Sequence, residues 1–171
     1  MTHQFKSFET ERLLITPTAI IDAPFILELM NTPKWKQFIG ERNLHSIEDA
    51  ENYIQQKMLP QLEKLGYSNY TVSLKSNNTK IGTCGLYNRE GLEGLDIGFA
   101  FLPKYEKQGY GYESAKRLIE AAKSEFGITK ISAITIKENT PSQKLIEKLG
   151  LTFVKMINIP KDSEDLMLYS V

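Results

Sequence analysis

The chain is poor in several features that mark particular classes of protein. Its 171 residues include one cysteine, Cys84, so an intrachain disulfide is impossible and a reducing, cytoplasmic location is expected. No run of about 20 apolar residues is present, so no membrane-spanning helix is predicted. The first residues contain no apolar stretch of the kind that forms a signal peptide. No internal repeat or low-complexity segment is visible.

Charge of one sign is also lacking. Lys and Arg together number 21, as do Asp and Glu, so the formal net charge is zero. Partners that are nucleic acids or anionic membranes usually meet a basic surface, so neither is expected. His3 and His45 are far apart and have no cluster of other ligands, so no metal site is predicted. Any anion site must therefore be a local arrangement.

What is present suits one folded unit. A hydrophobic content of 41% over this length can bury a full core, and residues 1–171 are expected to form a single domain. Composition leaves both a monomer and a homodimer open.

The most informative stretch runs from a buried strand through a loop into a helix. Residues 95–102 are almost all apolar or aromatic, and Pro103 ends them. Gly109 and Gly111 follow a polar loop, and apolar side chains then recur at helical spacing over residues 112–126. Unpaired N–H groups at a helix start, the helix dipole and the close approach that glycine permits together favour a phosphate. A connection that binds nothing is the alternative, because short Gly-x-Gly patterns are common.

Strand and helix patterns alternate along the rest of the chain. A short helix is predicted after Thr140, with Thr140 as its N-cap, Pro141 at its first position and Gln143 completing a capping box. Pro60 is expected to kink or break the second helix, and residues 35–42 are expected to be irregular. The predicted strands cover residues 10–17, 70–75, 81–87, 95–102, 128–137, 151–159 and 165–169, and the first two helices cover 22–30 and 46–65.

Two motifs and the start of the chain resemble a known family. Residues 95–115 resemble the acetyl-CoA loop of the GNAT N-acetyltransferase superfamily, closest to its RimJ/RimL-type branch, whose members acetylate protein N-termini or small amines. The family pattern Gln/Arg-x-x-Gly-x-Gly/Ala falls on residues 106–111, with both glycines matched and Glu106 in place of Gln or Arg. Asn139-x-x-Ser142, followed by Glu-Lys-Leu-Gly, is similar to a second family motif, and Thr-Glu-Arg-Leu-Leu-Ile at residues 10–15 is a typical beginning.

The resemblance implies a fold and a reaction. The fold would be the α+β GNAT fold, with a mixed, mostly antiparallel central sheet that splays at the cofactor site and helices that flank it. The activity would be acetyl transfer from acetyl-CoA, with CoA as product, to the primary amine of a protein N-terminus or a small molecule. Two other readings stay open. One is a CoA-binding module with impaired catalysis, and the other is a cofactor-free α+β interaction domain.

The resemblance also assigns roles to residues. The backbone N–H of Phe99 or Ala100 would face the carbonyl oxygen. Ser142 would protonate the leaving thiolate, because Ile146 stands where many members have a tyrosine. Asp96 is a candidate general base, although a structural hydrogen-bond acceptor is an equal alternative. The expected cofactor-binding residues are Phe99, Ala100, Phe101, Lys107, Gln108, Gly109, Tyr110, Gly111, Tyr112, Asn139 and Ser142.

Overall fold

The computed structural model describes residues 5–160, 162 and 164–171, so His3 lies outside the described residues. Within them an eight-stranded sheet has the order β1-β2-β3-β4-β5-β6-β8-β7. Its strands are β1 (Phe8–Glu9), β2 (Leu13–Pro17), β3 (Asn69–Leu74), β4 (Lys80–Tyr87), β5 (Leu95–Phe101), β6 (Ile131–Ile136), β7 (Thr152–Ile157) and β8 (Leu166–Ser170). The helices are α1 (Ala23–Met30), α2 (Pro33–Phe38), α3 (Ile47–Tyr53), α4 (Leu59–Leu65), α5 (Tyr110–Phe126) and α6 (Thr140–Lys148).

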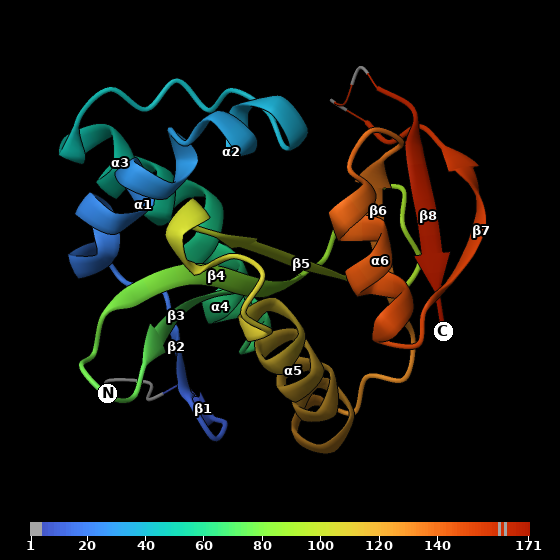
Figure 1. The fold of residues 1–171 in the computed structure, drawn as a ribbon, viewed down its shortest axis with the longest axis horizontal. Helices are drawn as coiled ribbons and strands as arrows, with labels where there is room; N and C mark the ends of the chain where they lie inside the picture. Colours follow the sequence, from blue (N-terminus) through green and yellow to red (C-terminus); the bar gives the residue numbers. More distant parts are fainter. Residues whose placement is uncertain (1–4, 161, 163) are drawn as a thin grey trace.

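The sheet divides into two parts at the junction of β5 and β6. Strands β3, β4 and β5 pair in chain order as an antiparallel meander. Strands β5 and β6 run parallel and pair where Leu95 meets Ile131 and Asp96 meets Ser132, beyond which they separate. In Figure 1 the unit of β6, α6, β8 and β7 stands apart from α1, α2 and α3, and β5 leads from one to the other. This mixed, splayed sheet confirms the predicted α+β GNAT fold.

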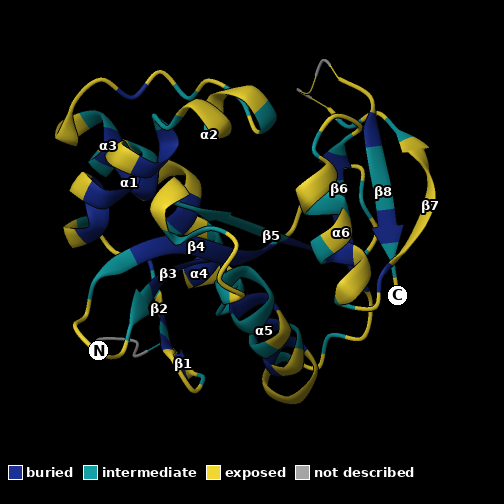
Figure 2. Ribbon diagram, viewed as in Figure 1, coloured by how far each residue is buried: buried dark blue, intermediate teal, exposed yellow. Residues whose placement is uncertain are grey.

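Two buried clusters lie on opposite faces of β5. Because side chains alternate along a strand, Phe99 and Phe101 pack with the cluster beneath α5, whereas Ala100 and Leu102 pack with the cluster of α1 and α3. Figure 2 shows β4 as mostly buried, whereas β5 is buried in its first part and intermediate in the rest. The even-numbered residues of β5, Asp96 included, therefore face the α1 and α3 layer.

Two predictions about the segment 31–66 are corrected. Residues 35–38 of the segment 35–42 belong to α2 rather than being irregular, because Thr32 accepts a hydrogen bond from the Trp35 N–H and caps α2. Helical residues continue on both sides of Pro60, so the predicted break is absent. The preceding residues Ile54–Met58 form a π-helical turn, and Pro60 then enters within the first positions of α4, where a missing N–H costs little. Gly66, at φ +87°, ends α4 as predicted.

The cap of α6 lies one residue earlier than predicted. Asn139, not Thr140, is the N-cap, and its side chain accepts a hydrogen bond from the Ser142 N–H. Gln143 does not complete a capping box, because its side-chain amide donates to the carbonyls of Ile136 and Lys137. Ser142 is therefore the third helical residue rather than the second.

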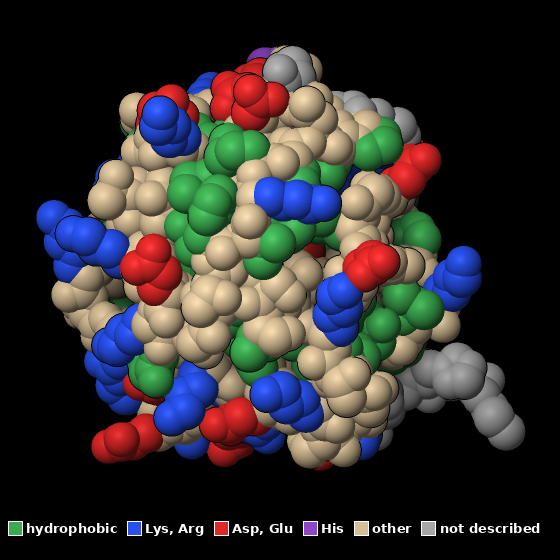
Figure 3. Space-filling model, turned by 90° about the vertical axis from the view of Figure 1, so that its right-hand side faces the viewer, with side chains coloured by type: hydrophobic (Ala, Val, Ile, Leu, Met, Phe, Trp, Pro, Cys, Tyr) green, Lys and Arg blue, Asp and Glu red, His purple; other side chains and the backbone are tan. Residues whose placement is uncertain are grey.

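The outer edge of the sheet is exposed. Strand β7 carries Phe153, Val154 and Met156 with about half of each residue accessible to solvent. In Figure 3, which faces this side of the molecule, hydrophobic side chains lie among Lys, Arg, Asp and Glu side chains and do not form an uninterrupted patch. Among the described residues no helix is long and apolar enough to cross a membrane.

Candidate functional site

The edge of β5 that faces the splay carries unpaired backbone groups. The Leu95 N–H donates to Lys130 on the β6 side, and the Leu102 N–H donates to Ile81 on the β4 side. Since backbone groups alternate in direction along a strand, Ile97, Phe99 and Phe101 point their N–H and C=O groups toward the gap left by β6. Of the two backbone donors considered from the sequence, Phe99 thus faces the splay and Ala100 faces β4.

A loop of unusual backbone geometry links β5 to α5. Lys107 and Gly109 adopt left-handed conformations, with φ of +60° and +85°. Gly109 is the N-cap of α5, so the helix begins at Tyr110, two residues earlier than predicted. A Cβ at Gly109 would be strained in that conformation and would lie 3.2 Å from an Arg12 nitrogen. Glycine at this position therefore gives the chain its turn into the helix.

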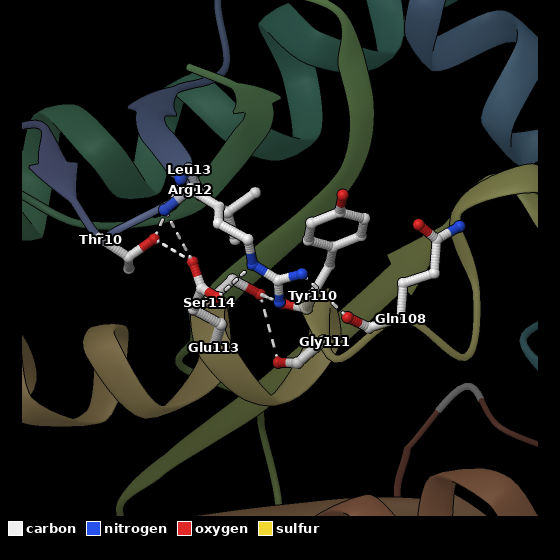
Figure 4. Close-up of polar contacts among 8 residues, drawn as sticks. All are labelled: Thr10, Arg12, Leu13, Gln108, Tyr110, Gly111, Glu113 and Ser114. Atoms are coloured by element: carbon white, nitrogen blue, oxygen red, sulfur yellow. Dashed lines mark hydrogen bonds and ion pairs between the residues drawn. The ribbon is translucent and has the colours of Figure 1, made fainter. Parts of the chain in front are cut away.

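Arg12, which directly precedes β2, holds the loop in place (Figure 4). Its guanidinium donates to the Gln108 carbonyl at 3.1 Å and to Glu113 at 2.8 Å, and it lies 4.3 Å from the centre of the Tyr110 ring. Thr10 adds a hydrogen bond from its hydroxyl to Glu113. One arginine thus holds the loop, the first helical residue and the first-turn carboxylate in a single arrangement.

The two carboxylates beside the loop are both neutralised. Burial opposes ionisation of Glu113, but hydrogen bonds from Thr10 and Arg12 outweigh it and lower the pKa of Glu113. Glu106, the departure from the family pattern, forms an ion pair with Lys34 of α2. With these negative charges compensated, the loop can accept an anion despite its acidic residues.

Gly111 is where the loop, β5 and α6 meet. A Cβ there would lie 3.0 Å from Leu145 of α6 and 3.7 Å from Phe101 of β5. The lack of a side chain lets α5 approach α6 closely at the mouth of the splay. At both Gly109 and Gly111 a Cβ would contact a neighbouring side chain, so the lack of one permits the close packing at the start of α5. The neighbouring predicted residues Lys107 and Gln108 are exposed, while Tyr110 and Tyr112 are half-buried.

The N-terminus of α6 lies on the other side of the splay. Asn139 follows β6 and uses its side-chain oxygen to cap the helix, which leaves its amide N–H groups free to donate elsewhere. Ser142 is half-buried. No side chain or carbonyl among the described residues is hydrogen-bonded to its hydroxyl, which is therefore available to a ligand.

Asp96 is held in a buried ion pair. It lies opposite Tyr87 of β4, is 2% exposed, and accepts a 2.5 Å hydrogen bond from Arg89 through Oδ2. Its Oδ1 is buried with no hydrogen-bond partner in the described part of the chain. Burial raises the pKa of Asp96 to about 6, although the charge and the hydrogen bond of Arg89 oppose that rise.

Tyr87 and Arg89 complete this side of the splay. The Tyr87 ring lies over Gly85 and Gly98, its hydroxyl donates to Asn69, and the Arg89 guanidinium stacks 5.1 Å from its centre. The Tyr87 ring thus packs directly on the backbone at Gly85 and Gly98, where no side chains intervene. Sequence reasoning missed the pairs of Arg12 with Glu113 and of Arg89 with Asp96. The only signal for the first was the motif at residues 10–15.

Comparisons with known proteins agree with this geometry. The sequence matches the family model of the acetyltransferase (GNAT) domain over residues 12–152. It is 28% identical over 158 residues to the uncharacterized N-acetyltransferase YnaD of Bacillus subtilis strain 168, an alignment that covers 91% of this chain and 89% of YnaD.

Solved structures show the same architecture. A GNAT-family acetyltransferase from Bacillus anthracis matches with a TM-score of 0.79 and 26% identity, over 97% of this chain and 98% of that chain. RimL, a ribosomal-protein α-N-acetyltransferase in complex with coenzyme A, matches with a TM-score of 0.82 over 97% of each chain. Its identity is 15%, so this likeness concerns the fold alone.

Proposed function

The chain belongs to the acetyltransferase (GNAT) family, and on that premise we propose that it transfers an acetyl group from acetyl-CoA to a primary amine. The open edge of β5, which ends beside the first turn of α5, is the observation that carries the proposal. A strand edge with free N–H and C=O groups can hydrogen-bond the amide groups of the acetyl-CoA arm. A helix start with glycines can bind the phosphates of the same cofactor.

The described residues fit such a cofactor. The N–H groups of residues 108–112 would hold the pyrophosphate, with Gly109 and Gly111 leaving room for it. The odd-numbered residues of β5, together with the side-chain amide of Asn139, would bind the peptide-like arm. Support also comes from the solved structure of RimL, which is a complex with coenzyme A.

Acetyl-CoA supplies an activated thioester, and the protein residues then move protons and stabilise charge. The Phe99 N–H faces the splay, where it would stabilise negative charge on the carbonyl oxygen. Asp96 would accept a proton from the amine, directly or through water at its unpaired Oδ1, since an amine must be neutral to attack. The Ser142 hydroxyl would donate a hydrogen bond to the departing thiolate.

The acceptor is proposed from the sequence resemblance to the RimJ/RimL-type branch. It would be the amine of a protein N-terminus or of a small molecule, bound on the α1 and α3 side of β5, where Asp96 lies. Residues 1–171 would form a single domain for this reaction.

A melting experiment followed by a thiol-release assay tests the function. Acetyl-CoA at 100 times its Kd should raise the free energy of unfolding by about 2.7 kcal/mol. Thiol release should then be measured with N-terminal peptides, polyamines, aminoglycosides and amino acids as acceptors. No stabilisation would favour the cofactor-free interaction domain. Stabilisation without release for any amine would favour a binding module with impaired catalysis.

Replacing Ser142 with alanine should lower turnover by about 10- to 100-fold, because one hydrogen bond to the leaving group is lost. Affinity for acetyl-CoA should change little, as measured by calorimetry. Ser124→Ala on α5, which removes a hydroxyl bonded to Glu120, is the matched control. Asn139→Ser keeps a capping oxygen but removes the amide, so it should weaken acetyl-CoA binding instead. Full turnover in Ser142→Ala, with chemistry shown to be rate-limiting, would exclude this role.

A further inference from the structure

Two lysines from different helices lie on one tyrosine ring near the loop. The ammonium of Lys148, at the end of α6, is 4.3 Å from the centre of the Tyr112 ring, and that of Lys116 on α5 is 5.8 Å from it. Among the described residues, no carboxylate lies within 4.0 Å of either ammonium. The two ammonium groups repel each other, and an anion bound between them would compensate this repulsion.

Glu113 and Arg117 on the same helix are engaged elsewhere, whereas Glu120 forms no ion pair with another described residue. Glu113 is taken by Thr10 and Arg12. Arg117 donates to the Glu9 carbonyl and stacks on the ring of Phe8. Lys116 and Lys148 are thus cations without an ion-pair partner among the described residues.

An open depression of about 450 Å³ extends from Lys116 to the loop. It is lined by Gly109 at the helix start, by Tyr112 and Lys116 along α5, and by Arg12, which directly precedes β2. The carboxylates of Glu113 and Glu120 also belong to the lining. Helical side chains lean toward the N-terminus, so the stem of Lys116 covers the turn that contains Tyr112. The depression and the lysine pair therefore adjoin the place proposed for the pyrophosphate.

We propose that Lys116 and Lys148 bind the 3′-phosphate on the ribose of the cofactor and thereby select CoA over its dephospho form. This inference rests on the proposed function, because it takes acetyl-CoA as the ligand. The ribose follows directly after the pyrophosphate in that molecule. A phosphate on it would reach lysines one helical turn from the loop, and the Tyr112 ring would keep both ammonium groups facing it.

The test compares CoA with dephospho-CoA, which differ only in that phosphate. Wild-type protein should bind CoA about 10-fold more tightly by calorimetry at low salt, and added salt should reduce this preference. Lys116→Gln and Lys148→Gln should each weaken CoA binding by about three- to tenfold, while dephospho-CoA binding stays unchanged. Lys123→Gln, which removes the same charge near the far end of α5, should leave both affinities unchanged.

The possible outcomes separate this inference from the proposed function. Equal wild-type affinity for the two ligands would overturn the 3′-phosphate site while leaving acetyl-CoA binding intact. An equal loss for both ligands in Lys116→Gln and Lys148→Gln would also overturn it, because the lysines would then act on another part of the cofactor. Failure to bind either ligand would overturn the proposed function and this inference with it.

Discussion

Replacing Asp96 with asparagine should lower turnover by about 10²–10⁴-fold while acetyl-CoA affinity changes little. The side chain would keep its shape but could no longer accept a proton. Asp96 points its side chain to the α1 and α3 side of β5, whereas Phe99 points its side chain to the other side. The substitution should therefore not disturb the proposed cofactor contacts and should lower turnover alone. Steady-state thiol release and calorimetry on the same preparation measure the two effects.

The pH dependence of turnover gives a second view of Asp96. Its pKa is raised to about 6 by burial, against the opposing influence of Arg89. A base must be deprotonated, so wild-type turnover should fall as the pH drops through about 6. Asp96→Asn should lose this limb of the profile. An active variant with an unchanged profile would show that water or another group accepts the proton.

Stability should change in the opposite direction to activity. The folded pKa of Asp96 lies above the ordinary value of 3.8, so the folded state binds this proton more tightly than the unfolded state does. The contribution of Asp96 to stability is therefore greatest below about pH 4 and is lost as the pH rises through about 6. Asp96→Asn should abolish this pH dependence of the free energy of unfolding, and it also leaves Arg89 without its carboxylate partner.

Asp22 offers a matched control for the loss of a buried carboxylate. It is 5% exposed, pairs with Lys80 at 2.7 Å, and accepts hydrogen bonds from Ala19 and Thr71, away from the splay. Asp22→Asn should reduce stability and leave turnover per folded molecule unchanged. If Asp96→Asn behaved in this same way, Asp96 would be a structural acceptor, the alternative that the sequence left open.

Replacing Gly109 with valine should weaken acetyl-CoA binding by at least about 100-fold. Gly109 has φ +85°, a conformation that a β-branched residue resists, so the loop would rebuild and its N–H groups would turn away. Loss of two hydrogen bonds to a charged ligand accounts for a change of this size. Calorimetry with acetyl-CoA measures it, and circular dichroism checks that the fold survives.

Gly127→Val is the control for Gly109→Val. Gly127 ends the same helix at φ +65°, and a Cβ there would meet no atom within 4 Å. Strain alone should therefore reduce stability in both variants, but only Gly109→Val should lose the cofactor. Equal acetyl-CoA affinity in the two variants would contradict the loop assignment. Gly111 is less suitable for this test, because a side chain there also meets Leu145.

The sequence predicted those elements whose formation depends on residues close together in the chain. Alternation and turn residues gave the meander from β3 to β5, and helical spacing gave α5. The helix α2 was not predicted because Thr32 and Pro33 closely follow the end of α1. A proline there also suits the end of a helix, whereas Thr32 caps the next one. Asn139 and Thr140 can both cap α6, and only the backbone conformation decides between them.

Contacts between distant segments could not be predicted in the same way. Arg12 and Glu113 are separated by 101 residues, and no periodic pattern links them. Arg89 reaches Asp96 across a turn of irregular structure, so its role also depends on the folded geometry. The motif residues around Gly109 and Ser142 were found because they are contiguous. The residues that support them are scattered through the chain.

The separation between Arg12 and the loop has a consequence for the order of folding. Contacts between residues far apart in sequence form late. Closing a long loop costs conformational entropy, and the favourable free energy of the contact is gained only afterwards. Helix α5 can form early, but residues 107–113 take their final shape only after β2 has docked beside them. A ligand that needs this shape cannot bind an intermediate in which β2 is still free. Acetyl-CoA should therefore slow unfolding and leave the rate of folding almost unchanged.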